Sequence, residues 1–139
     1  MTRFAADAFR FDLPGDGWRE ESVQFFSPEG DDASAFMIGR RERAADAAES
    51  IEHALASFPK STFLEVELVR SEWIEVGALQ GTDLAIIARA KTGADYMRLV
   101  ILPYYDEDLY LNWGGPASDR TAVDARAERS LETMRFRRR

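Results

Sequence analysis

Few residues of this chain belong to the types that carry out catalysis or bind transition metals. The chain contains no cysteine and a single histidine, His53. The absence of cysteine excludes a thiol nucleophile, a disulfide and a thiolate metal site, and one histidine is too few for the usual zinc sites. On the helix expected around it, His53 points away from the apolar stripe. We therefore expect it to be a solvated side chain rather than a ligand or a general base.

The carboxylates match neither a calcium loop nor an acid–base pair. Asp31-Asp32 and Asp106-Glu107-Asp108 lack the alternating ligands and central glycine of a calcium loop, so both are expected to lie in turns. Glu20 and Glu21 are neighbours on an expected strand and would point to opposite faces. Nucleophile-elbow, phosphate-loop and dinucleotide motifs are also missing. We therefore expect no enzyme activity, no metal site and no cofactor.

Composition favours a globular domain that does not bind nucleic acid. The formal net charge is −7, whereas nucleic-acid binding depends on neutralising phosphates with Lys and Arg; the one basic cluster is Arg135 with residues 137–139. Of the 139 residues, 45% are apolar, enough for a real core. No apolar run approaches the roughly 18 residues of a spanning helix, and no signal peptide is visible. These features predict one cytoplasmic domain over residues 1–139 that is not embedded in a membrane.

The pattern along the chain predicts an α+β fold. Apolar and polar residues alternate, or apolar residues cluster, in runs bounded by Gly, Pro and Asp turns, which is typical of strands. The expected strands are 8–13, 18–26, 33–41, 63–76, 84–91, 96–103 and 109–113.

Two helices are expected between and after these strands. One runs from Ala47 to Phe58, capped by Asp46 and carrying an apolar stripe, and the other from Thr121 to Met134, with a polar face that includes Asp124 and Glu128 and is expected to be solvated. The order of strands and helices predicts a twisted antiparallel sheet of about six to seven strands with two main helices packed on it.

Several expected strands are apolar in both phases. Ala85 and Ile87 alternate with other apolar residues, and Met97, Leu99 and Ile101 alternate partly with Val100 and Leu102. A strand that is apolar on both faces is covered on both faces, either by its own domain or by a partner. Trp18, Trp73 and Trp113 lie in or beside strands, where they could pack in the core or contact a ligand.

Three segments resemble the DcrB-related domain family. They are the apolar strand ending in Leu13-Pro14, the run from Trp18 through Glu21-Ser22-Val23 to Phe26, and Phe36 to Arg41 before a helix. Two departures are Gln24, where the family pattern has Asn, and the lack of a signal and cysteine. The resemblance implies the fold shared by Mog-type Ran-binding proteins and PsbP proteins. Among members of this length it points to the Eag chaperones of type VI secretion.

This resemblance implies a non-enzymatic chaperone or adaptor that acts as a homodimer. It would bind the apolar, transmembrane-type helices of a secreted effector protein and shield them on an apolar sheet surface with a charged rim. The candidate client-binding residues are Val23, Phe25, Met37, Gly39, Leu99 and Ile101, with small Gly39 forming a hole for a side chain. Two other readings remain open: a general protein-interaction module, and a small-ligand-binding or enzymatic domain with a deep pocket.

Overall fold

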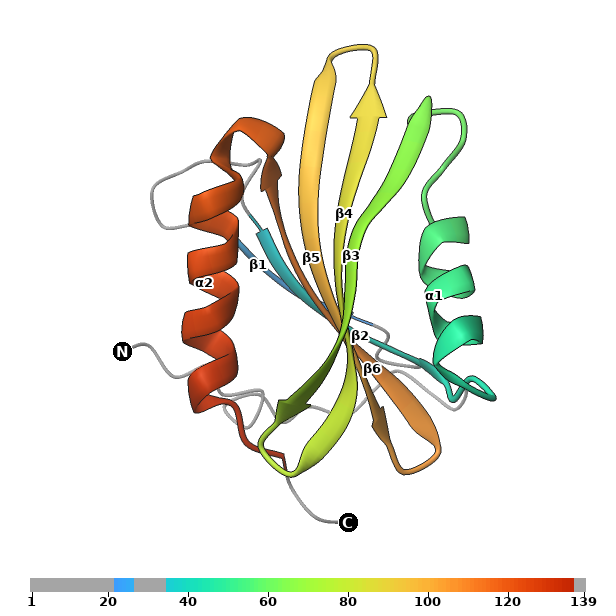
Figure 1. Cartoon of the computed structure of the whole chain (residues 1–139), viewed down its shortest axis with the longest axis vertical. Coiled ribbons are helices and arrows are strands. Elements are labelled where there is room, and N and C mark those ends of the chain that lie inside the picture. Colours follow the sequence, from blue (N-terminus) through green and yellow to red (C-terminus); the bar gives the residue numbers. More distant parts are fainter. Residues whose placement is uncertain (1–21, 27–34, 137–139) are drawn as a thin grey trace, which may run out of the picture.

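The computed structural model describes residues 22–26 and 35–136 and shows one antiparallel sheet with a helix on each face (Figure 1). Its elements are β1 (Ser22–Phe26), β2 (Ala35–Glu42), α1 (Ala47–Ala56), β3 (Glu65–Val76), β4 (Leu79–Ala90), β5 (Gly93–Tyr104), β6 (Glu107–Pro116), the short 3₁₀ helix η2 (Ala117–Asp119) and α2 (Arg120–Thr133). This arrangement confirms the predicted α+β class. The strand expected at 8–13 lies outside the described residues.

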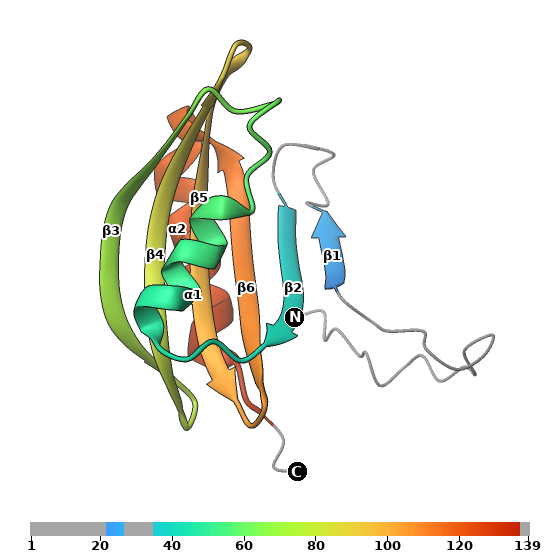
Figure 2. The same cartoon turned by 90° about the vertical axis from the view of Figure 1, so that its right-hand side faces the viewer.

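The six strands follow the order β1-β2-β6-β5-β4-β3, and every neighbouring pair is antiparallel. Strands β3 to β6 form a meander of long hairpins, and β2 pairs with β6. Helix α1 therefore carries the chain from β2 across one face of the sheet to β3 at the far margin, as Figure 2 shows. Helix α2 packs on the opposite face (Figure 1).

Each face of the sheet has its own apolar core, because β4 and β5 are apolar in both phases. On the α2 face the buried residues are Val76, Ala85, Tyr96, Val100, Leu102, Leu109, Leu111, Trp113, Val123, Ala127 and Leu131. On the α1 face they are Ala54, Leu84, Ile86, Leu99 and Ile101. The chain's own helices thus cover the centre of both faces, which answers part of the question raised by the sequence.

Helix α1 begins where the sequence predicted. The Asp46 carboxylate accepts a hydrogen bond from the Glu49 backbone N–H at 2.9 Å, and the Glu49 carboxylate accepts one from the Ala45 N–H at 2.8 Å. This reciprocal pair resembles a capping box, except that the donor to Glu49 is the backbone N–H of Ala45 rather than that of the cap residue Asp46. The helix ends at Ala56, two residues before the predicted Phe58.

The hairpins are longer than predicted, because their turns contain only two residues. Gly77, with φ of 61°, supplies the left-handed conformation that the β3–β4 turn requires. Gly81 was expected to separate two strands but lies within β4, where a Cβ would collide with the Ile101 carbonyl. Asp108 was expected in a turn but lies in β6 and is buried. Its carboxylate accepts hydrogen bonds from Ala44 N at 2.9 Å and Ser50 Oγ at 3.3 Å.

Candidate functional site

Helix α1 covers only the middle of its face of the sheet. Its apolar side, with Ile51, Ala54 and Leu55, packs on the cluster that contains Leu84 and Ile86. Figure 2 shows α1 crossing in front of the central strands, with β3 on one side and β2 and β1 on the other. The face therefore continues on both sides of the helix.

On the β2 side, the uncovered part of this face forms an apolar groove. The groove has a volume of about 390 Å³, within the range of about 300–1,000 Å³ that is usual for ligand pockets. It is lined by Met37, Gly39, Arg41, Ala54, Ser57, Phe58, Pro59, Phe63, Met97, Leu99, Tyr110 and Asn112. We call it the α1 groove.

Four of the six predicted client-binding residues lie on this face. Met37, Gly39 and Leu99 line the α1 groove, and Gly39 lies between Met37 and Arg41 on the same face of β2. Ile101 is buried among the residues beneath α1 and borders a neighbouring pocket near the start of the helix.

Val23 and Phe25 follow a different register. Their Cα partners on β2 are Ile38 and Phe36, whereas Met37 pairs with Gln24. Directly paired residues share a face of an antiparallel sheet, and Phe36 stacks on Trp113 in the α2-side core at 4.7 Å between ring centroids. The strand register thus places Val23 and Phe25 opposite residues of β2 other than Met37 and Gly39. The side chains of Val23 and Phe25 themselves lie outside the described residues.

A polar residue that the sequence analysis missed lies on the floor of the α1 groove. Asn112 pairs with Met37 on β2 and with Leu99 on β5, and its Oδ1 is buried without a hydrogen-bond partner in the described part of the chain. A buried acceptor without a donor costs about 1–3 kcal/mol. The groove thus contains one acceptor site that a bound donor could satisfy.

One end of the groove is cationic. The Arg41 guanidinium carbon lies 5.9 Å from the centre of the Tyr110 ring, within the range of cation–π contacts. Burial raises the pKa of Tyr110 above its ordinary value, and the positive charge of Arg41 acts in the opposite direction. Tyr110 is therefore a neutral hydrogen-bonding group at neutral pH.

The opposite face of the sheet contains a buried ionic network that sequence reasoning also missed. Arg98 is only 3% exposed, and its guanidinium donates two hydrogen bonds of 2.5 Å to the Asp83 carboxylate. Two carboxylates of α2 also accept hydrogen bonds from the Arg98 guanidinium: Glu128 at 2.8 Å and Asp124 at 3.4 Å. The predicted solvation of the polar face of α2 holds for Glu128, whose side chain is 58% exposed, whereas Asp124 is only partly exposed. The sequence does contain a signal for this network: Arg98 is a lone arginine within an apolar strand, and a buried charge requires a partner.

Hydrogen bonds within this network keep Arg98 charged and Tyr96 neutral. Burial lowers the pKa of Arg98, but hydrogen bonds to Asp83 and Glu128 outweigh this effect and raise it overall. Burial and the hydrogen bond donated to Asp124 at 2.7 Å both raise the pKa of Tyr96. The network therefore stays charged around Arg98 and ties α2 to the sheet, a structural role.

The described residues contain no arrangement typical of a metal centre. No group of three or more His, Asp or Glu side chains within residues 22–26 and 35–136 is placed to hold an ion. His53 lies on α1 with its Nε2 3.6 Å from the Glu49 carboxylate, in a partly exposed position. Within the same residues, no helix is long and apolar enough to cross a bilayer.

Comparison with known proteins identifies the fold. No family model matches the chain, and no curated protein matches it. Among solved structures, a Pseudomonas aeruginosa protein of unknown function, PA94, described as a candidate regulator, has a TM-score of 0.75 at 17% identity, covering 100% of this chain and 99% of that one.

Two further structures extend the comparison. Cyanobacterial PsbP from Synechocystis has a TM-score of 0.54 at 6% identity, covering 84% of this chain and 81% of its own. LpqN, involved in cell envelope biogenesis of Mycobacterium tuberculosis, has a TM-score of 0.52 at 15% identity, covering 88% and 80%. These likenesses establish that the chain has a PsbP-like fold, which the family resemblance implied.

Proposed function

We propose that this protein is a chaperone or adaptor that binds an apolar, transmembrane-type helix of a client protein in the α1 groove. The observation that carries the proposal is the groove itself: an apolar hollow beside α1 whose floor is formed by strands β2, β6 and β5. Many proteins recognise a partner by binding the apolar face of its helix in such a groove.

The shape of the groove supports a helical client. Helix α1 forms one wall and provides a surface against which a second helix could pack, while Gly39 leaves space in the floor for a side chain. Met37 and Met97, which line the groove, are flexible and polarizable, a property that suits surfaces binding varied apolar sequences.

Asn112 supports a client that carries a small polar residue. A serine or threonine hydroxyl at the right position of the client helix could donate to the unpartnered Asn112 Oδ1. Serine and threonine are common where transmembrane helices pack closely. Replacement of Asn112 by leucine is expected to reduce the preference for serine-containing over all-aliphatic helices.

The cellular role follows from the family resemblance. The protein would act in the cytoplasm as a homodimer without a cofactor and without catalysing a reaction, holding the apolar helices of a type VI secretion effector until the effector is exported. The exposed side chains of Arg41, near the end of β2, and Arg43, just after it, would form part of the charged rim that keeps the empty protein soluble.

The test is the affinity of the purified protein for a helical peptide of about 20 residues, built from leucine and alanine with one serine and held in mild detergent. Met37→Glu places a charge in the groove and is expected to weaken binding by about tenfold or more, because the charge would be buried without a partner. The matched control is Leu64→Glu, which adds the same charge at a residue 70% exposed and outside the groove.

Equal affinities for the two variants would contradict a site in the α1 groove. A wild-type protein that stays monomeric by analytical ultracentrifugation and ignores the peptide would contradict the proposed function itself. Native mass spectrometry of the freshly purified protein distinguishes the small-ligand alternative, since a retained small molecule would favour that function.

A further inference from the structure

The outer edge of β3 is a second surface that neither helix covers. β3 is the last strand of the sheet, and among the described residues no strand pairs with its outer side. Figure 2 shows β3 at the margin of the sheet, beside α1 rather than beneath it. A 12-residue edge strand offers a row of free backbone groups that can template another strand.

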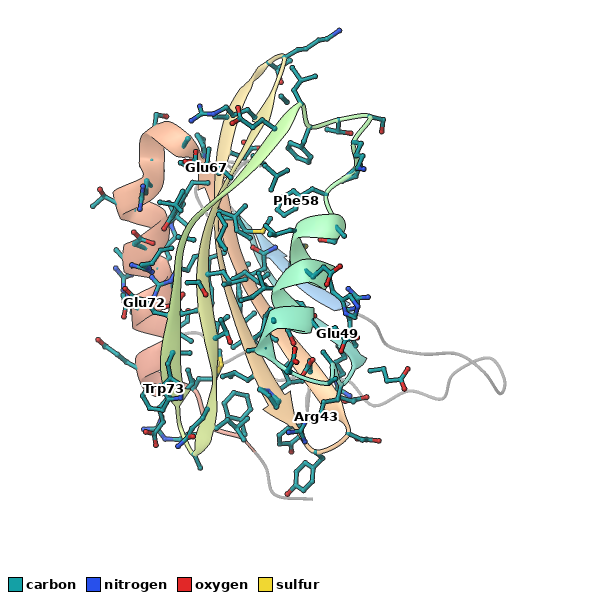
Figure 3. All side chains as sticks on the ribbon, turned by 45° about the vertical axis from the view of Figure 1, so that its right-hand side comes forward. Arg43, Glu49, Phe58, Glu67, Glu72 and Trp73 are labelled. Carbon is teal, nitrogen blue, oxygen red and sulfur yellow. The ribbon has the colours of Figure 1, made fainter. Side chains whose placement is uncertain are left out.

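One face of this edge strand is apolar and exposed. Leu68 pairs with Ile86 of β4, and Trp73 pairs with Thr82. Because Ile86 belongs to the cluster beneath α1, Leu68 and Trp73 lie on the same face of the sheet as α1. Trp73 is 66% exposed although tryptophan is normally well buried. Figure 3 places Trp73 near the lower end of β3, and its side chain lines a pocket shared with Ala47 and Ser50 at the start of α1.

The other face of the edge is acidic. Glu65, Glu67 and Glu72 share the phase that pairs with Arg89, Ile87 and Asp83 of β4. Within β3 the only basic residue is Arg70, whose guanidinium lies 3.7 Å from the buried Asp83 carboxylate and 3.9 Å from the exposed Glu72 carboxylate. Arg89 approaches Glu65 and Glu67 only at 3.8 Å, in an exposed setting where such pairs are weak. The edge thus has unbalanced negative charge.

This charge pattern disfavours pairing with a second copy of the chain. In an antiparallel two-fold arrangement centred on the middle of β3, Glu67 would oppose Glu72, since both lie in the same phase of the strand. Like charges directly opposite each other destabilise a strand pair. The β-bulge between Leu68 and Arg70 further interrupts a long symmetric ladder. The same glutamates would attract a basic strand, so they select one kind of partner while rejecting another.

We propose that the outer edge of β3 binds, by strand addition, an extended segment of a partner protein in which Lys or Arg alternates with apolar residues. The basic side chains would face Glu65, Glu67 and Glu72, and the apolar ones would extend the surface of Leu68 and Trp73. Backbone hydrogen bonds would give affinity, and the alternation would give specificity. This site is separate from the α1 groove and does not depend on the function proposed for it.

The experiment titrates the full chain with a blocked peptide of about ten residues in which lysine and valine alternate. Trp73 fluorescence reports binding, and saturation is expected below about 1 mM at low ionic strength. Glu67→Lys combined with Glu72→Lys is expected to weaken binding by about tenfold or more. The matched control, Glu52→Lys with Glu132→Lys, makes the same change in net charge at exposed positions of α1 and α2 and should have little effect.

A second peptide, methylated at alternate backbone nitrogens, separates strand addition from charge attraction. It keeps the charges but loses hydrogen-bond donors, so its affinity should fall by about tenfold or more. Equal binding of both peptides, equal effects of the two double variants, or no binding at about 1 mM would overturn the proposal. A homodimer that Glu67→Lys and Glu72→Lys dissociate would assign the edge to a second copy and also overturn it. Met37→Glu should leave peptide binding unchanged, which separates this result from the test of the groove.

Discussion

The buried pair of Arg98 and Asp83 predicts that removing one charge will cost far more stability than removing a charge at the rim of the same network. Asp83→Ala leaves the Arg98 guanidinium, 3% exposed, without its two 2.5 Å hydrogen bonds. Breaking a buried ion pair by removing one partner typically costs about 3–5 kcal/mol. Such a loss is a large fraction of the roughly 5–15 kcal/mol that stabilises an ordinary domain.

The comparison variant is Glu128→Gln, which removes a charge from the same arginine. The Glu128 side chain is 58% exposed, so water can replace much of its interaction, and the expected loss is about 1 kcal/mol or less. Replacing Arg98 and Asp83 together by Met and Leu should cost less than Asp83→Ala alone, because the buried charge of Arg98 is removed together with its main partner.

Equilibrium unfolding in urea measures these differences, with tryptophan fluorescence and far-UV circular dichroism as independent probes. Buried Trp113, which stacks on Phe36, provides a fluorescence signal from the same side of the sheet. If Asp83→Ala and Glu128→Gln lower the free energy of unfolding by the same amount, the assignment of Arg98 as a buried, Asp83-dependent charge is refuted.

Three further predictions follow from local features. Burial and the hydrogen bond to Asp124 raise the pKa of Tyr96 above 10.0, so the unfolded chain ionises first and stability should fall as pH rises from about 10 toward the raised value; Tyr96→Phe should reduce that slope in unfolding curves measured against pH. Asp46→Ala removes the cap of α1 and should cost about 1 kcal/mol, seen as faster amide exchange in the helix; unchanged exchange would count against the cap. Gly81→Ala should destabilise by about 1–3 kcal/mol in thermal unfolding, because its Cβ meets the Ile101 carbonyl, and a neutral effect would show that this close approach is absent.

The fold could be predicted because its determinants are local or periodic. The cap at Asp46 and the apolar runs of β4 and β5 are visible in the sequence, and the structure contains both. Strand ends were less predictable. Glycine usually interrupts a strand, but Gly81 lies inside β4 because the neighbouring backbone passes too close for a side chain.

The site was only partly predictable, because the phase of each strand depends on pairing between distant segments. Leu99 and Met37 share the α1 groove through the order β2-β6-β5, which no local pattern reveals. Val23 and Phe25 were grouped with them because all are apolar strand residues, yet their register matches Ile38 and Phe36. Asn112 could not be predicted as a site residue, because only the structure shows that it is surrounded by apolar groove residues.

Site-specific photocrosslinking tests the central claim most directly. The chain can be labelled with photoreactive methionine, which places probes at Met37 and Met97 in the α1 groove, at Met134 beside Gly77 on the α2 side, and at Met1 outside the described residues. All three described positions are partly buried, so their exposure is comparable. With the apolar helical peptide bound, mass spectrometry should find crosslinks at Met37 and Met97 and not at Met134. Crosslinks at Met134 with none at Met37 or Met97 would contradict the α1 groove as the client site.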